Sequence, residues 1–228
     1  MTNRNLYKGR TSMEKTTYTK WDGFRAIILY VVGCIIPVIC CGILPQTRIS
    51  YDTINILLFT LDYIPILLCL MFVKYEKRGL SSIGIRLTKS WKHIIILLIG
   101  TVIMVSINGV FSCIFMEKTH ITTLFGSYIN ILIFLPGAIE EELTCRAYLQ
   151  TRLRGLIDNE KLVLFIGAFL FLLSHYPVKW CVGKWFLPID SVILLIILGL
   201  VCGIQYNKTN NVWIPIITHF IYNMVQFV

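Results

Sequence analysis

Charged side chains are scarce in this chain of 228 residues: Asp, Glu, Lys and Arg together make up 14% of it. A soluble domain of this length carries about 25% charged residues and about 45–50% apolar ones. Here the apolar share is 56% and the mean hydropathy is +0.73. One small soluble core cannot bury so much apolar surface, so part of it must face lipid. The composition therefore excludes a soluble enzyme, a secreted disulfide scaffold and a disordered tail.

The sequence also lacks a cysteine framework, although it contains eight cysteines. All of them except Cys181 lie inside apolar runs, where cysteine behaves as a small hydrophobe. Their positions give neither a disulfide pattern nor a zinc-type spacing. Basic residues outnumber acidic ones by nine, but they lie in short loops between apolar runs. Because no soluble segment carries a basic face, we predict no nucleic-acid partner.

Seven apolar segments are near the length of about 20 residues that a membrane-spanning helix needs. Because lipid offers no hydrogen bonds to a free backbone, each segment is expected to be a helix. The predicted fold is an all-α polytopic bundle in the lipid bilayer, with about seven spans: Phe24–Leu44, Thr53–Val73, Ile94–Phe115, Ser127–Leu149, Leu162–His175, Ile189–Tyr206 and Val212–Val228.

The basic residues are divided unevenly between the two sides of the membrane. With the N-terminus inside the cell, 16 of the 21 Lys and Arg fall on the inner side and four on the outer side, while Arg146 lies within a span. An excess of Lys and Arg in cytoplasmic loops is the usual pattern. We therefore predict a multi-pass plasma-membrane protein with a cytoplasmic tail at 1–23, N-terminal transmembrane helices at 24–126 and a second membrane domain at 127–228.

Several ionisable or amide side chains nevertheless lie within the apolar segments. Each ionisable group costs about 2.5–3.5 kcal/mol inside a membrane, so each is a candidate functional residue. Those of the second half lie on three separate segments: Glu140, Glu141, Glu142, Arg146, His175, His219 and Asn223. A neutralising network between helices explains a single buried pair well. It explains three acids, an arginine and two histidines less well.

Helical spacing separates the three glutamates. Glu142 and Arg146 are four residues apart, so they share a helix face and are predicted to pair. Glu141 lies about 100° around the helix from Glu142 and is not neutralised by that arginine. Glu140 is turned a further step away and is expected to face a neighbouring helix or water.

The same residue types suggest hydrolysis. A carboxylate beside a histidine in a dry pocket activates water for attack on an amide, and a second histidine with an asparagine supplies donors to the oxyanion. His219 and Asn223 are again four residues apart. A glutamate with two histidines is also a zinc-ligand set, although the helical His-Glu-x-x-His arrangement is absent. Spacing alone leaves both chemistries open.

Three motifs at these positions resemble those of the CPBP family of intramembrane glutamic endopeptidases, which includes type II CAAX prenyl endopeptidases and bacterial Abi-type proteins. Glu141-Glu142-Leu-Thr-Cys-Arg146 matches Glu-Glu-x-x-x-Arg, Phe171-Leu-Leu-Ser-His175 matches Phe-x-x-x-His, and His219-Phe-Ile-Tyr-Asn223 matches His-x-x-x-Asn. Each motif alone is weak. Three in this order on successive apolar segments, over about residues 127–227, are a specific signal.

The resemblance implies a catalytic domain at 127–228 and a role for each site residue. Glu141 with His175 would activate the hydrolytic water, His219 with Asn223 would stabilise the oxyanion, and Glu142 with Arg146 would hold the site together. It also implies no metal, no other cofactor, and a peptide or membrane-protein substrate.

The sequence therefore predicts an intramembrane endopeptidase, and the bacterial members imply a role in bacteriocin maturation or self-immunity. The alternative is a non-catalytic membrane adaptor or immunity protein that binds a partner, as some relatives do after losing motif residues. A proton-coupled transporter is a third reading, but the chain lacks an inverted repeat. Asp62, His93 and His120 are predicted to be non-catalytic, the first inside the bundle and the histidines at span ends.

Overall fold

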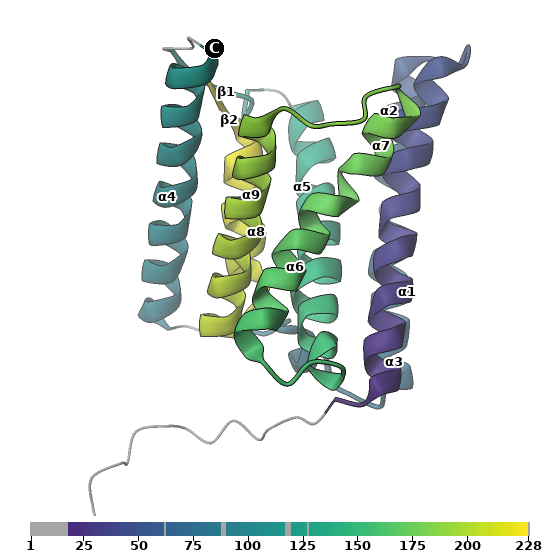
Figure 1. Cartoon of the computed structure of the whole chain (residues 1–228), viewed down its shortest axis with the longest axis vertical. Helices are drawn as coiled ribbons and strands as arrows, with labels where there is room; N and C mark the ends of the chain where they lie inside the picture. The colour runs from purple at the N-terminus through teal and green to yellow at the C-terminus, as the bar shows by residue number, and fades with distance from the viewer. Residues whose placement is uncertain (1–17, 62, 88–89, 117–119, 127, 228) are drawn as a thin grey trace, which may run out of the picture.

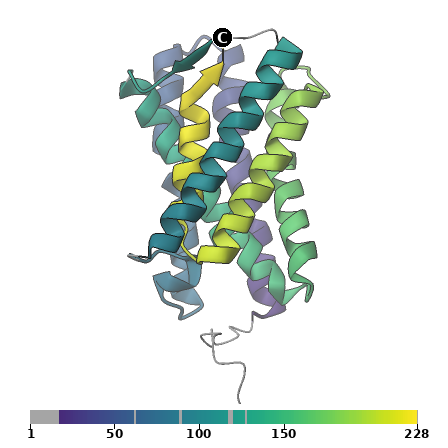
Figure 2. The ribbon, with the colours of Figure 1, turned by 90° about the vertical axis from the view of Figure 1, so that its left-hand side faces the viewer.

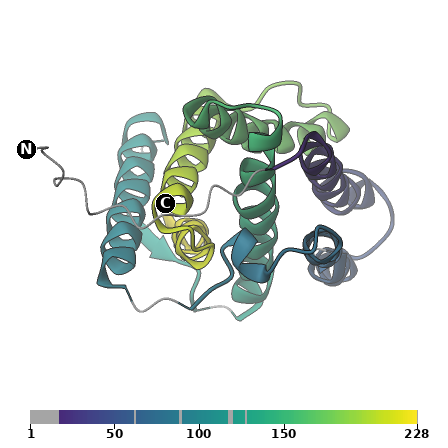
Figure 3. The same ribbon diagram turned by 90° about the horizontal axis from the view of Figure 1, so that it is seen from below.

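The computed structural model describes residues 18–61, 63–87, 90–116, 120–126 and 128–227. These residues form a bundle whose long helices run between two end faces (Figure 1). We call the end at which α1 begins the N-terminal face, and the other end the opposite face. The turned view shows α4 and α8 running side by side along one side of the bundle (Figure 2). Seen from below, α4 is peripheral, and α9 and α5 lie between it and α1 (Figure 3).

The α-helices of the described residues are α1 (Lys20–Pro37), α2 (Tyr51–Leu61), α3 (Tyr63–Tyr75), α4 (Trp91–Met116), α5 (Tyr128–Glu142), α6 (Glu160–Ser174), α7 (Tyr176–Cys181), α8 (Ile189–Thr209) and α9 (Trp213–Met224). Two of them continue as π-helices, α1 into η1 (Val38–Ile43) and α5 into η4 (Leu143–Gln150). Short 3₁₀ turns form η2 (Leu44–Gln46), η3 (Leu80–Ile83) and η5 (Leu153–Gly155). Strands β1 (Ile121–Thr123) and β2 (Val225–Phe227) pair antiparallel at the opposite face.

Capping side chains start two of these helices at the N-terminal face. The Thr19 hydroxyl accepts from the backbone N–H of Asp22, whose carboxylate accepts from the Thr19 N–H, so α1 begins with a capping box. The Asn159 side chain accepts from the N–H groups of Lys161 and Leu162 at the start of α6. These bonds satisfy N–H groups that have no partner within the helix.

The all-α prediction is confirmed. Five described segments are long and apolar enough to cross a membrane: Lys20–Gln46, Asp52–Tyr75, Trp91–Phe115, Glu160–Cys181 and Ile189–Thr209. They correspond to five of the predicted spans. Their outer sides remain apolar, as on α4, where Val102 is 62% and Ile114 is 67% exposed. These surfaces account for the apolar composition, because lipid is the solvent that suits them.

The other two predicted spans differ from single long apolar helices. The fourth is helical over its described residues, but α5 and η4 carry the glutamates and Arg146. The seventh, predicted at Val212–Val228, has only 12 residues in α9, which is about 18 Å against a hydrocarbon thickness of about 30 Å. Its helix ends at Met224, because Val225–Phe227 is extended and pairs with β1.

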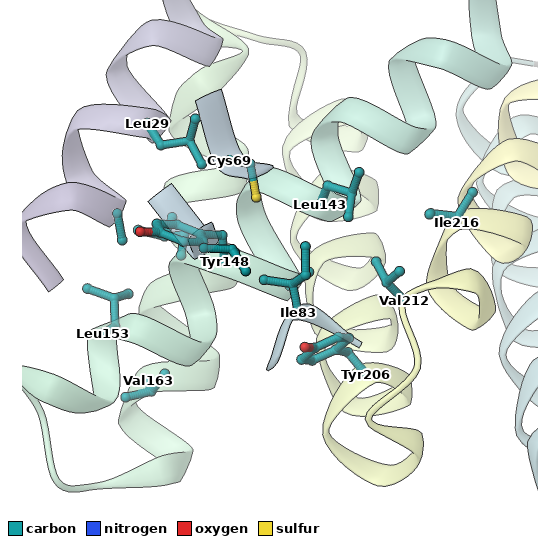
Figure 4. Packing of buried hydrophobic residues seen from close by; sticks show 14 residues of the cluster. Leu29, Cys69, Ile83, Leu143, Tyr148, Leu153, Val163, Tyr206, Val212 and Ile216 are labelled. Atoms are coloured by element: carbon teal, nitrogen blue, oxygen red, sulfur yellow. The ribbon is translucent and has the colours of Figure 1, made fainter. Parts of the chain in front are cut away.

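A cluster of buried apolar side chains packs in the half of the bundle near the N-terminal face (Figure 4). Leu29 of α1, Cys69 of α3, Tyr148 of η4 and Tyr206 of α8 belong to it. Next to it, the buried Glu76 carboxylate accepts from Arg152, with Nη2–Oε2 at 2.8 Å. These contacts hold α1, α3, η4 and α8 together. Because α5 continues directly into η4, they also fix the position of α5.

Helices α4, α8 and α9 pack closely because Gly100 has no side chain. A Cβ at this position would lie 2.7 Å from Cδ of Gln205. The Gln205 amide donates to the Ile96 carbonyl at 3.0 Å and to Thr218 Oγ1 at 2.9 Å. We expect Gly100→Ala to displace this amide and to lower the free energy of unfolding by about 1–3 kcal/mol, measured by thermal denaturation in detergent.

Gly137→Ala is the matched control for that substitution. Gly137 also lies in a helix, but apart from its two chain neighbours and the backbone of its own helix, no described atom lies within 4 Å of the position its Cβ would take. Alanine has the higher helix propensity, so the control is expected to keep or slightly raise the melting temperature. Equal melting temperatures for Gly100→Ala and wild type would show that the close packing at Gly100 contributes nothing.

Candidate active site

The three consecutive glutamates lie in the last turn of α5, where the α-helix passes into the π-helix η4. π-helical turns are rare and often occur at functional sites. Glu142 is fully buried and Glu140 is 7% exposed, whereas the Glu141 side chain retains 35% of its exposure. Glu141 is therefore the most accessible of the three carboxylates.

One chain of polar contacts joins four of the predicted site residues. Arg146 Nε lies 3.2 Å from Glu142 Oε2, so the pair predicted from spacing is present. The other Glu142 oxygen, Oε1, accepts from His219 Nδ1 at 2.9 Å. The opposite edge of that imidazole faces Glu141, with Nε2 and Oε2 3.8 Å apart. His219 on α9 thus lies between two glutamates of α5.

His175 closes α6 and is oriented by its own helix. Its Nδ1 lies 2.8 Å from the carbonyl oxygen of Phe171, and Ser174 Oγ lies 3.3 Å from the same nitrogen. A carbonyl oxygen only accepts, so Nδ1 carries the proton in this contact. In the neutral ring Nε2 is then an acceptor, available to take a proton from water.

Phe171 lies at the centre of these groups and is fully buried. The guanidinium carbon of Arg146 lies 3.9 Å from the centroid of its ring. Both histidine rings meet it at steep angles, His175 at 5.0 Å and His219 at 5.8 Å between centroids. The sequence marked Phe171 as a motif residue without giving it a role. Its position four residues before His175, on the same helix face, was the available signal.

A cavity of about 250 Å³ opens beside Glu141 between α1, η1, α5, η4, α6 and α7. Both Glu141 and His175 line it, so the structure brings these two predicted residues to one space. The lining also includes Leu187, from the loop that joins α7 to α8 at the opposite face. The cavity therefore extends toward the opposite face.

Glu142, Arg146 and His219 lie behind Glu141 rather than in the lining of this cavity. Asn223 is half-buried in the last turn of α9. Within the described part of the chain, no hydrogen bond joins Asn223 to the other predicted site residues. The structure thus places Asn223 one helical turn after His219 without bringing it into the contact chain.

The remaining candidates lie elsewhere. His93 is in the first turn of α4, and His120 directly precedes β1; neither lines the cavity. Asp62 is outside the described residues. Over the residues that the structure describes, no group of three or more His, Cys, Asp or Glu side chains is arranged to hold a metal ion.

Fold and site together define a helical membrane protein with an ionic site buried inside its bundle. Residues 124–225 match the family model described as type II CAAX prenyl endopeptidase Rce1-like. This segment contains all three motifs, so the resemblance seen in the sequence is confirmed: this part of the chain is similar to a protease family. Searches of curated proteins and of solved structures found no match.

Proposed function

We propose that the protein is an intramembrane endopeptidase that hydrolyses a peptide bond in a membrane-associated or peptide substrate. The observation that carries the proposal is that the Glu141 carboxylate and the His175 imidazole line the same cavity. The match to a family of endopeptidases supports peptide bonds as the target. Residues 127–228 are the proposed catalytic domain.

In the proposed reaction, a water molecule in the cavity is activated by Glu141 and His175. The Glu141 carboxylate takes a proton from this water as its oxygen attacks the carbonyl carbon, while His175 Nε2 accepts the second hydrogen bond and orients the water. A C–O bond forms and the carbonyl becomes an oxyanion. Glu141 then returns the proton to the amide nitrogen as the C–N bond breaks, which releases a carboxylic acid and an amine.

His219 is the proposed oxyanion donor, with Asn223. Carboxylates flank both ring nitrogens of His219, with Nδ1 2.9 Å from Glu142 Oε1 and Nε2 3.8 Å from Glu141 Oε2. The Glu142–Arg146 pair keeps the ring in place, because the same Glu142 carboxylate contacts both His219 and Arg146.

Cleavage of a peptide library by the purified protein in lipid nanodiscs tests the proposal directly. In water enriched in heavy oxygen, each new C-terminus is expected to carry one heavy atom. Hydroxylamine is expected to leave the products unchanged, because attack by water forms no acyl-enzyme. Hydroxamate products, or no new termini from an intact protein, would contradict the mechanism.

We also propose that the N-terminus is cytoplasmic and that the membrane is the plasma membrane. The described basic residues support this orientation, because most of them lie at the N-terminal face. Substrate would then reach the cavity from the outer side, and processing of a secreted or bacteriocin-like peptide, in maturation or self-immunity, fits that access.

Reporter fusions measure this orientation. Alkaline phosphatase folds only outside the cytoplasm, so a sandwich fusion after Gly183, in the loop between α7 and α8, is expected to be active. A fusion after Asp158, in the loop before α6, is the matched control and is expected to be inactive. The reverse pattern would place the cavity on the cytoplasmic side.

Replacing Phe171 by Leu is expected to lower kcat by about tenfold, because the substitution removes the ring that supports Arg146 and both histidines. KM is expected to change less, since Phe171 does not line the cavity. Phe169→Leu is the control on the same helix, because its side chain is 55% exposed toward lipid. Equal kcat values for both variants would show that the Phe171 ring does not support catalysis.

A further inference from the structure

Glu140 is a third carboxylate in the cavity, and the proposed reaction does not use it. It lines the cavity beside Glu141 and is 7% exposed. The Thr144 hydroxyl, one helical turn later, donates to Glu140 Oε1 at 3.0 Å. An ionisable group within a membrane-spanning bundle is costly, so its position at the wall of an active-site cavity requires a functional reason.

Helix α1 leaves room for this carboxylate at Gly33. A Cβ at Gly33 would lie 2.9 Å from Glu140 Oε1 and 3.7 Å from Cγ2 of Thr144. The absent side chain therefore lets α1 pass close to Glu140 and form the facing wall of the cavity. Glu140 Oε1 is held between Gly33 and Thr144, which fixes the carboxylate in the wall.

Much of the remaining lining is apolar. Tyr30 and Pro37 from α1, Val178 from α7 and Leu187 from the following loop contribute carbon surface. The ionisable residues of the lining, its thiols and the Tyr30 hydroxyl apart, are Glu140, Glu141, His175 and Lys179. Among them the two carboxylates outnumber the one lysine.

Such a cavity matches a side chain with an apolar stem and a cationic head. Lysine and arginine combine both parts, since their methylene chains pack on apolar surface while the charged end finds polar partners. A cavity of about 250 Å³ has room for one side chain of this size together with the reacting bond. A lysine or arginine head forms charge-assisted hydrogen bonds with a carboxylate of the lining, which an apolar side chain cannot do.

We propose that Glu140 determines specificity by binding a lysine or arginine side chain of the peptide substrate close to the bond that is cleaved. This inference rests on the proposed peptidase function. It assigns Glu141 to the chemistry and Glu140 to recognition, so neighbouring carboxylates on one helix turn have separate tasks.

Two sets of short leucine–alanine peptides test the inference. In one set a single lysine is moved along the peptide, and in the other norleucine, which has a similar length and no charge, takes its place. Cleavage by the wild type in nanodiscs is expected to prefer lysine at one position by about tenfold or more in kcat/KM. Glu140→Gln is expected to remove most of that preference. Binding of the same peptides, by fluorescence anisotropy in a Glu141→Gln background, gives a readout that needs no turnover.

Gly33→Ala provides a second variant, because its methyl group would press on Glu140 Oε1. It is expected to weaken the lysine preference in the same direction, whereas Ile35→Ala, at a lipid-facing position of α1 that is 48% exposed, is expected to keep it. Cleavage with equal rates for lysine and norleucine, or a preference that survives Glu140→Gln, would overturn the inference and leave the peptidase intact. Lysine-selective binding that depends on Glu140, without any cleavage, would instead support recognition and refute the peptidase.

Discussion

Replacing Glu141 by Gln is expected to lower the rate of peptide cleavage by about 10²–10⁴-fold, because the amide cannot take the proton of the attacking water. Gln has the same shape, and the Glu141 side chain is 35% exposed, so the variant is expected to fold as the wild type does. The measurement is kcat/KM in nanodiscs on a peptide that the wild type cleaves, with the melting temperature of each protein recorded alongside.

Glu160→Gln is the matched control, since Glu160 is an exposed glutamate at the start of α6, at the N-terminal face. It is expected to keep wild-type activity. A Glu141→Gln protein that retains activity within a factor of a few of wild type would show that another group activates the water. A large loss of melting temperature in Glu141→Gln would instead mark Glu141 as a structural residue.

Arg146→Met is expected to cause the largest loss of stability, about 3–5 kcal/mol, because it leaves the fully buried Glu142 without its cationic partner. Methionine fills a similar volume and can still pack on Phe171, so loss of charge rather than loss of volume dominates. The effect is measured as the shift in melting temperature in detergent and as the amount of folded protein recovered from membranes.

The double variant Glu142→Gln/Arg146→Met separates charge from packing. Removing both charges avoids an uncompensated buried carboxylate, so the double variant is expected to regain part of the stability that Arg146→Met loses. It is not expected to regain activity, because Glu142 Oε1 also holds His219 at 2.9 Å. A double variant no more stable than Arg146→Met would show that this pair does not stabilise the bundle through its charges.

Contacts within one helix were predictable from the sequence. Positions four residues apart on a helix always share a face, so the spacing of Glu142 and Arg146 sufficed to predict their pairing. The apolar periods likewise predicted the helical bundle, since lipid leaves few backbone structures available. The polar character of the fourth segment was also visible in its glutamates.

Contacts between helices were harder to predict from the sequence. The position of His219 between Glu141 and Glu142 depends on how α9 packs against α5, which neither segment encodes alone. The contribution of α1 to the cavity could not be predicted from the sequence. Gly33 lies within an apolar run, and only the folded structure shows that it faces Glu140 closely. The last residues of the seventh segment continue a mostly apolar run, so the pairing of Val225–Phe227 with β1 was not foreseen.

Comparative proteomics of cells that express wild type or Glu141→Gln at equal levels is the direct test of proteolysis by this carboxylate. Membranes and medium are analysed for peptides and protein termini that differ between the two strains. We expect at least one peptide or truncated protein that is present with wild type and lost with Glu141→Gln, with a new C-terminus at the cleaved bond. Identical termini in both strains, together with an unchanged phenotype, would contradict this expectation and indicate a binding role that does not use this carboxylate.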